Sequence, residues 1–250
     1  MDTTRYKYAL QLGDNALILA QRLGEWCGHG PVLEQDIALT NIALDLLGEA
    51  RLWLSYAAEL EGRGRTEDEL AYFRDAPEFR NALLLEQPNG DWACTIARQF
   101  FFDTFHFHLM QALAGSADKR LAAIAEKTLK EVRYHLQFSS EWMIRLGDGT
   151  ALSHQKIQTA VDDLWMYTGE LTTPNETEKL AAEAGTGVET AEIQPLWAAK
   201  VAAVLDEATL RTPQAGWMQS GGKDGRHTEH LGYILAEMQH LQRSYPGLEW

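Results

Sequence analysis

Apolar residues recur along most of the chain in steps of three and four, and the alternation expected of β-strands is almost absent. This pattern predicts helices throughout, separated by turns rich in glycine and proline. Four long helices are predicted over residues 5–26, 33–60, 91–114 and 119–146. Shorter helices are predicted over residues 67–73, 153–171, 193–210 and 228–243.

The second long helix carries the most regular stripe. Its apolar residues alternate steps of four and three, which is typical of helices packed in bundles: Leu39, Ala43, Leu46, Ala50, Trp53, Ala57 and Leu60. The connection over 61–90 is long enough for a crossover between the two halves of a bundle. With no internal repeat and no evident boundary, the sequence predicts one all-α domain over residues 1–250, a bundle of four long helices with additional flanking helices.

Composition and charge narrow the function classes. The 250 residues are 45% hydrophobic and 23% charged, as in ordinary globular proteins. Asp and Glu number 36 against 22 Lys and Arg, and the resulting charge of −14 disfavours nucleic acid and membranes as partners. Cys27 and Cys94 form neither a disulfide framework nor a metal-binding spacing. Without a signal-peptide pattern or an apolar run of ~20 residues, we expect a cytoplasmic protein.

Ionisable residues on the predicted core stripes raise the question of a di-iron site. A carboxylate-bridged di-iron bundle takes ligands from four helices, two of which supply Glu-x-x-His. Asp103 lies within the apolar stripe of the third long helix, and His135 lies on that of the fourth. The residue three positions before His135 is Val132, however, and Glu131 stands one position too early.

The first two long helices also lack part of the expected set of di-iron ligands. On the second, Asp45 is followed three residues later by Gly48, where the pattern requires histidine, and Glu49 is out of register. On the first, Asp14 and Glu25 lie off the inner stripe. The six ligands of a di-iron centre are therefore not all supplied in register.

Three interpretations follow for the surviving positions: an active di-iron site, a single-metal site, or a polar network without metal. The network is favoured, because buried ionisable groups usually persist by pairing. In it, Asp103 and His135 would pair through hydrogen bonds or water. No catalytic or cofactor-binding residue is assigned, and Asp45, Asp103 and His135 are predicted to be vestigial di-iron positions.

Four stretches, in order along nearly the whole chain, resemble the C-subunit family of the bacterial phenylacetyl-CoA 1,2-epoxidases, proteins of phenylacetate degradation. They are LGDNALILAQRLGEWCGHGPVLEQDIALTNIALDLLGEAR (12–51), LLLEQPNGDWACTIARQFFFD (83–103), KEVRYHLQFSSEWMIRLGDGT (130–150) and GGKDGRHTEHLGYILAEMQHLQR (221–243). The resemblance implies a ferritin-like fold and a place in a multicomponent oxygenase that epoxidises the aromatic ring of phenylacetyl-CoA.

The same resemblance implies that the di-iron centre belongs to a related A subunit, with electrons from NADPH delivered through a separate reductase subunit. This chain would then hold no cofactor and act as a non-catalytic structural partner of the A subunit and the other subunits. Val132 and Gly48 stand where the active subunit has glutamate and histidine. The alternative is a di-iron oxygenase or oxidase with an atypical ligand set, requiring Asp45, Glu49, Asp103, Glu131 and His135 to converge.

Three further features bear on partners and ligands. The third long helix is aromatic on nearly all sides, so another subunit, either A or a second copy in a homodimer, is predicted to cover part of it: Phe100, Phe101, Phe102, Phe105 and Phe107. HTEH at 227–230 fits an N-cap at Thr228 better than a metal-binding histidine pair. The loop GGKDGRH lacks the strand and spacing of a phosphate-binding loop and is a candidate contact loop for a partner.

Overall fold

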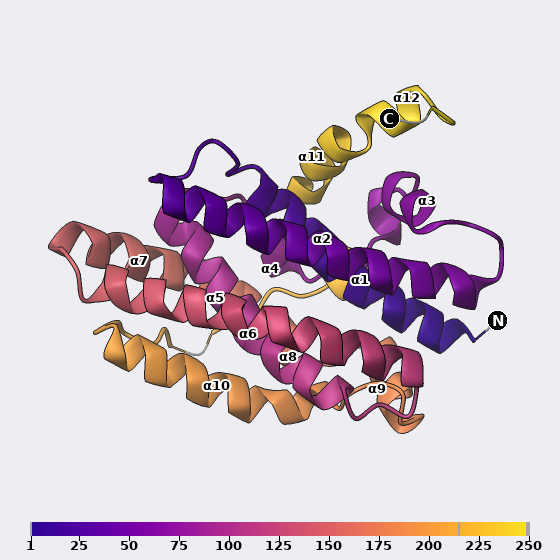
Figure 1. Ribbon diagram of the computed structural model, residues 1–250. Coiled ribbons are helices and arrows are strands. Elements are labelled where there is room, and N and C mark those ends of the chain that lie inside the picture. The colour runs from indigo at the N-terminus through magenta and orange to yellow at the C-terminus, as the bar shows by residue number, and fades with distance from the viewer. Residues whose placement is uncertain (1, 215, 249–250) are drawn as a thin grey trace. The chain divides into compact units, whose positions relative to one another are not determined.

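The computed structural model describes residues 2–214 and 216–248, which are helical without any β-strand among them (Figure 1). The four longest described helices are α1 (Thr3–Gly24), α2 (Leu33–Glu61), α5 (Trp92–Leu113) and α6 (Lys119–Gly147). Each begins and ends within two residues of its predicted bounds, and the starts at Leu33 and Lys119 agree outright. The all-α class and the long helices of the predicted ferritin-like bundle are confirmed.

The chain forms two compact units. One contains the described residues up to Pro88 together with those from Gly221 onward, and the other contains Asn89–Ser220. The first unit therefore joins the two ends of the chain, and the second is one continuous segment. The interpretation of the whole chain as one domain stays a prediction.

The first unit is built on α1 and α2, which pack along each other. They approach closely at Gly13 of α1, because a Cβ there would lie 2.8 Å from the Leu54 side chain. The predicted stripe of α2 is buried except at Leu60, which is half-buried, and Trp53 is wholly inaccessible. Gly62 ends the helix at a φ of +68°, a left-handed conformation that glycine adopts without strain.

A connection of short helices follows, and the end of the chain returns to it. The connection contains α3 (Glu67–Tyr72), η1 (Ala76–Glu78) and α4 (Leu83–Glu86). The returning segment contains η3 (Gly222–Asp224), α11 (Glu229–Met238) and α12 (His240–Ser244). The predicted helix over 228–243 is therefore broken at Gln239, whose side-chain amide donates to the carbonyls of Ala71 and Arg74.

Asp14 was predicted to lie off the inner stripe of its helix, yet it is completely buried. Its carboxylate accepts hydrogen bonds from both terminal nitrogens of Arg74, one of them at 2.9 Å, and from the backbone N–H of Arg80 at 2.9 Å. The guanidinium of Arg74 also lies 4.2 Å from the centre of the Phe79 ring. This buried, hydrogen-bonded ion pair attaches α1 to the connection. Helical periodicity could not reveal it, because Arg74 and Arg80 are about 60 residues from Asp14 in the sequence.

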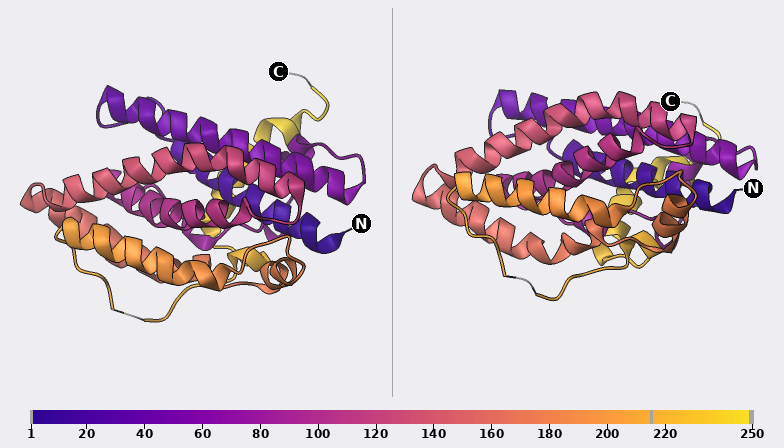
Figure 2. Two further views of the ribbon diagram at one scale, coloured as in Figure 1. Left: turned by 60° about the horizontal axis from the view of Figure 1, so that its bottom comes forward. Right: turned by 90° about the horizontal axis from the view of Figure 1, so that it is seen from below.

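In the second unit α5 and α6 pack side by side, and α7 (Ala151–Leu164) and α10 (Thr190–Glu207) also pack against α5. Figure 2 shows α10, in orange, running along this pair. The described part of the unit also contains η2 (Trp165–Tyr167), α8 (Gly169–Thr172) and α9 (Glu176–Glu183). The predicted helix over 153–171 is thus interrupted after Leu164, where the backbone tightens into a 3₁₀ turn.

Residues 172–192, which read as a connection rich in Pro, Glu and Gly, contain a helix that the sequence analysis missed. Asn175 and Glu178 form a reciprocal capping box at the start of α9. The signal was present in the sequence as Asn followed three residues later by Glu, but the surrounding composition masked it.

The aromatic helix α5 is the centre of the second unit. Phe100, Phe101, Phe102 and Phe105 are each at most 2% exposed. Phe101 contacts the rings of Trp165 and Trp197, while the indole N–H of Trp197 donates to the Phe101 carbonyl at 2.9 Å. The chain itself therefore buries these four rings, whereas Phe107 is only half-buried. That another subunit covers part of this helix stays a prediction.

Candidate functional site

Asp103 is the most unusual residue of α5, since its carboxylate is 1% exposed within the aromatic core of the second unit. The helix is capped by Asp91, whose side chain accepts from the N–H of Cys94, and the 3.6-residue period then places position 103 on the side facing α6. Gln99 donates from Nε2 to Asp103 Oδ1 at 2.6 Å, and Ser139 of α6 donates from Oγ to Oδ2 at 2.8 Å. Each carboxylate oxygen therefore has a donor.

Burial governs the acidity of this group. Removal from water raises the pKa of Asp103 from its ordinary 3.8 to about 6. The charge interaction with His135 opposes this most strongly, followed by the hydrogen bonds from Ser139 and Gln99. Because these effects only partly offset burial, the carboxyl titrates near pH 6 instead of near pH 4.

His135 interacts electrostatically with Asp103, but the two hydrogen bonds to the carboxylate come from residues that the sequence analysis missed. The predicted pairing of Asp103 and His135 through hydrogen bonds or water stays a prediction. Gln99 lies one helical turn before Asp103, and Ser139 lies one turn after His135. The spacing of four residues in each case was an available signal. The second amide atom of Gln99, Oε1, is buried and has no hydrogen-bond partner among the described residues.

The remaining ligand position on α6 is apolar. Val132, three residues before His135, is completely buried, while Glu131 is only half-buried. A valine side chain supplies no metal ligand, and the carboxylate that could replace it leaves the helix about 100° away. The gap inferred from the sequence is therefore a real property of the helix surface.

On α2, in the first unit, the candidate residues are spread around the helix. Asp45 is half-buried, and Gly48 is exposed, with nothing within 4 Å of the position that a Cβ would occupy. Glu49 is buried, and its Oε1 accepts the indole N–H of Trp53 at 2.8 Å. A carboxylate bonded to a tryptophan of its own helix is accounted for by the fold alone.

These donors do not fit a di-iron centre. Such a centre needs a carboxylate and a histidine three residues apart on each of two helices, and neither α2 nor α6 presents that pair. Across residues 2–214 and 216–248, no three His, Cys, Asp or Glu side chains are grouped so that they could hold a metal ion. The assignment of Asp45, Asp103 and His135 as vestigial positions stays a prediction.

Another buried carboxylate, Glu86 at the end of α4, was not anticipated. Its Oε1 accepts from the N–H and hydroxyl of Thr228, and its Oε2 accepts from Asn81 and lies 2.8 Å from Nδ1 of His227. His227 Nε2 is also 3.0 Å from the Phe79 carbonyl. The signal in the sequence was a lone acid at the end of the apolar run LLLE.

This cluster explains the HTEH segment differently from the prediction. Thr228 does occupy the N-cap position of α11, but its hydroxyl bonds to Glu86 and makes no capping bond. The preceding loop is also partly internal, since Gly222 and Lys223 are buried. A Cβ at Gly222 would lie 2.4 Å from the Asn81 carbonyl, so the loop depends on this glycine to pack against the connection.

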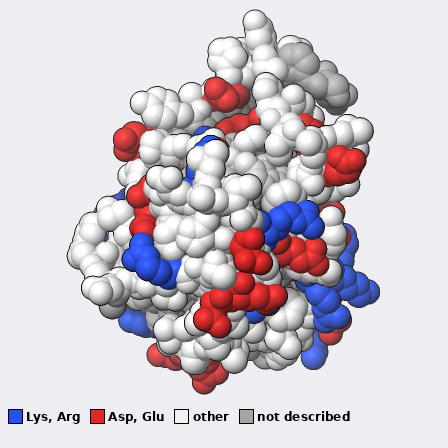
Figure 3. All heavy atoms as spheres, turned by 90° about the vertical axis from the view of Figure 1, so that its left-hand side faces the viewer, with Lys and Arg blue, Asp and Glu red and all other residues white. Residues whose placement is uncertain are grey.

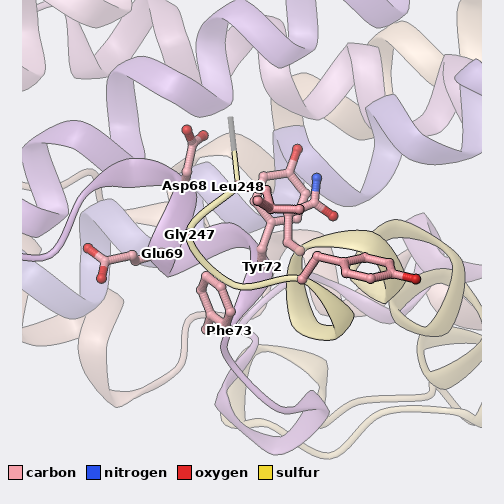
Figure 4. Close-up of a pocket in the computed structure, with 8 residues that line it drawn as sticks. Asp68, Glu69, Tyr72, Phe73, Gly247 and Leu248 are labelled. Carbon is pink, nitrogen blue, oxygen red and sulfur yellow. The ribbon is translucent and has the colours of Figure 1, made fainter. Parts of the chain in front are cut away.

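An open groove of about 480 Å³ lies between α3 and the residues after α12 (Figure 4). Its walls combine acidic and aromatic side chains, including Asp68, Glu69, Tyr72 and Tyr245. None of the predicted site residues lines it, and its side chains show no arrangement of nucleophile, base and orienting group. In the described part of the chain, no helix is both long enough and apolar enough to cross a membrane.

Comparison with known proteins places the fold and its incomplete ligand set in context. The family model described as phenylacetic acid catabolic protein matches residues 1–250. The chain is 55% identical over 243 residues to the C subunit of the 1,2-phenylacetyl-CoA epoxidase of Escherichia coli (strain K12), covering 97% of this chain and 98% of that protein. The resemblance seen in the sequence is confirmed, and the chain belongs to the phenylacetic acid catabolic protein family.

Proposed function

We propose that this chain is a non-catalytic structural subunit of a phenylacetyl-CoA epoxidase, and that it supports the di-iron A subunit in aerobic phenylacetate degradation. The similarity to the C subunit of such an epoxidase, over almost the full length of both chains, supports membership in the complex. The complex as a whole is an oxygenase. The catalytic iron resides in the A subunit, and electrons from NADPH arrive through a separate reductase subunit.

One observation carries the non-catalytic assignment. His135 has a buried valine at the position from which a glutamate would bridge the metals, and Asp45 has an exposed glycine where a histidine would bind. The buried carboxylates that remain are occupied with structural bonds, Asp103 to Gln99 and Ser139 and Glu49 to Trp53. These carboxylates are hydrogen-bonded to neighbouring side chains and do not form a set of metal ligands.

The surface charge is consistent with binding to another protein and disfavours binding to a polyanion such as nucleic acid. On the face shown in Figure 3, acidic and basic side chains are intermixed, and no broad basic patch is visible. With a net charge of −14, attraction to nucleic acid or to an anionic membrane is disfavoured.

The decisive experiment measures iron and turnover separately. The isolated chain, purified after growth with added iron, should contain far less iron than one atom per chain. The same chain should copurify with a coexpressed A subunit, and the complex should epoxidise phenylacetyl-CoA when the reductase and NADPH are supplied. A full di-iron complement in the isolated chain would instead support the alternative, an oxygenase or oxidase with an atypical ligand set.

A pair of substitutions distinguishes support from catalysis. Asp103→Asn combined with His135→Gln should leave turnover per assembled complex unchanged, even where altered stability lowers the yield of complex. The matched control is the removal of an iron ligand from the A subunit, which should abolish turnover in a complex that still assembles. Loss of turnover per assembled complex in the variant of this chain would contradict the proposal.

A further inference from the structure

The ring of His227 lies between two hydrogen-bond acceptors in the first unit. Its Nδ1 is 2.8 Å from Oε2 of Glu86, and its Nε2 is 3.0 Å from the backbone carbonyl of Phe79. The side chain is only 5% exposed, so the surrounding solvent does not replace either partner. A neutral imidazole carries one N–H and can donate to only one acceptor, whereas an imidazolium donates to both.

The carboxyl group of Glu86 accepts three further hydrogen bonds. Its Oε1 accepts from the N–H of Thr228 at 2.6 Å and from the Thr228 hydroxyl at 2.8 Å, and its Oε2 accepts from Nδ2 of Asn81 at 3.0 Å. So many donors favour the ionised form of the group. A fully buried carboxylate needs a compensating charge, and no lysine or arginine of the described residues donates to it. A His227 ring protonated at both nitrogens supplies that charge.

Other charged groups surround this pair, but the ring nitrogens of His227 bond only to Glu86 and Phe79 in the described structure. From α1, Arg22 donates to the backbone carbonyl of Glu86 at 2.8 Å. From the connection, Arg80 donates to the Phe79 carbonyl at 2.6 Å. Also nearby are Glu25, which pairs with Arg22, and, within four positions of His227 on its own segment, Lys223, Asp224, Arg226, Glu229 and His230. Because arginine stays protonated in proteins, histidine is the member of this bonded cluster that changes its charge near neutral pH.

The bonds of His227 attach the beginning of the returning segment to the connection. The loop before it packs closely there, because Gly222 and Gly225 leave no room for a Cβ against the carbonyls of Asn81 and Pro77. The rest of α11 is held separately by three buried apolar side chains, Leu231, Ile234 and Leu235. Loss of the bonds at His227 should therefore free the loop and the first turn of α11 before the remainder of the segment.

From this geometry we propose that Glu86 and His227 form a proton-dependent latch, which holds residues 221–230 against the connection while both ring nitrogens are protonated. When one ring proton is lost, a nitrogen lone pair faces either the Glu86 carboxylate or the Phe79 carbonyl, and that contact becomes repulsive. In the open form the ring is solvated and loses this proton near its ordinary value of about pH 6.5. Above that pH the closed form holds one proton more than the open form, so rising pH favours opening.

The first test follows the backbone amide of Thr228, because its N–H donates to the Glu86 carboxylate and reports the state of the latch directly. Hydrogen exchange of the full chain is measured between pH 6 and 9 and compared with the intrinsic exchange rate at each pH, which gives a protection factor. One linked proton changes an equilibrium by up to about tenfold per pH unit. The protection of Thr228 should therefore fall at least about tenfold over this range, and protection that is constant with pH would overturn the proposal.

A pair of substitutions assigns the effect to one histidine. His227→Gln removes the titrating ring and should make the protection of Thr228 independent of pH. His230→Gln is the matched control, because His230 lies on the same helix and its ring contacts that of Tyr233, so the variant should keep the pH dependence of the wild type. A fall in protection that persists in His227→Gln, or that disappears in His230→Gln, would contradict the proposal.

A second measurement does not depend on the folding of a variant. Nitrogen-15 NMR of the histidine side chains in the wild-type chain distinguishes an imidazolium from a neutral ring. His227 should be an imidazolium under every condition in which the Thr228 amide remains protected from exchange. A neutral His227 ring in a segment that is still closed would overturn the proposal. Neither result bears on the proposed structural function, which is tested separately by iron content and by turnover of the complex.

Discussion

The buried carboxyl of Asp103 allows a quantitative prediction about stability and pH. Its pKa is about 6 in the folded protein, against an ordinary value of 3.8. Between these pH values the folded state holds a proton that the unfolded state releases, so stability falls as pH rises through this window. At about 1.4 kcal/mol for each pH unit, the folded protein at pH 7 carries a cost on the order of 3 kcal/mol from this one group.

Asp103→Asn removes the titration with little change in shape. Below pH 4 the wild-type side chain is protonated and resembles asparagine, so the two proteins should have similar free energies of unfolding. At pH 7 the variant should be more stable by on the order of 3 kcal/mol. The new amide can also be satisfied, because Gln99 has a buried Oε1 without a hydrogen-bond partner in the described structure, and rotation of that amide would present it.

The assay is urea unfolding of both proteins at several pH values between 4 and 7. The difference between the two free energies of unfolding isolates Asp103, because the other titrating groups are common to both. Asp206→Asn, at an exposed carboxyl of α10, is the control and should give a difference that does not depend on pH. A flat difference for Asp103→Asn, or one in which the variant becomes less stable as pH rises, would refute the argument from burial.

Three other substitutions test contacts that organise the units. Arg74→Leu leaves Asp14 buried and unpaired and should cost about 3–5 kcal/mol in urea unfolding, whereas the double change Asp14→Leu, Arg74→Leu should recover much of the loss. Glu86→Ala removes the acceptor shared by Thr228 and Asn81, so residues 221–244 should gain sensitivity to protease before the rest of the chain does. Trp197→Phe loses the bond to an α5 carbonyl and should lower the free energy of unfolding by about 1 kcal/mol or somewhat more, while equal stability would show that the bond is unimportant.

Much of the helical framework could be predicted from the sequence, because a long amphipathic helix depends on residues three and four apart. The long helices α1, α2, α5 and α6 were therefore predicted to within two residues. Errors arose where short-range pattern and tertiary contact disagree. The 228–243 helix breaks at Gln239 because its side chain bonds to carbonyls more than 160 residues earlier.

For the candidate site too, local features could be predicted from the sequence, whereas contacts between helices could not. The absence of a complete Glu-x-x-His pair could be read directly from Val132 and His135, since ligand spacing on a helix is a local property. The hydrogen bonds of Asp103 could not be read from the sequence, because Ser139 approaches it from another helix. Its raised pKa was equally inaccessible, because the degree of burial depends on how side chains pack around it.

The sequence by itself determined the all-α class, the long helices, the incomplete ligand pattern and the family. Only the tertiary structure decided which polar residues are buried and with what partners, as for Asp14 with Arg74 and Glu86 with His227. It also decided that Phe100, Phe101, Phe102 and Phe105 of α5 are buried within the chain. The physical reason is that periodicity states which residues share a face of a helix, whereas only the packing of distant segments decides what covers that face.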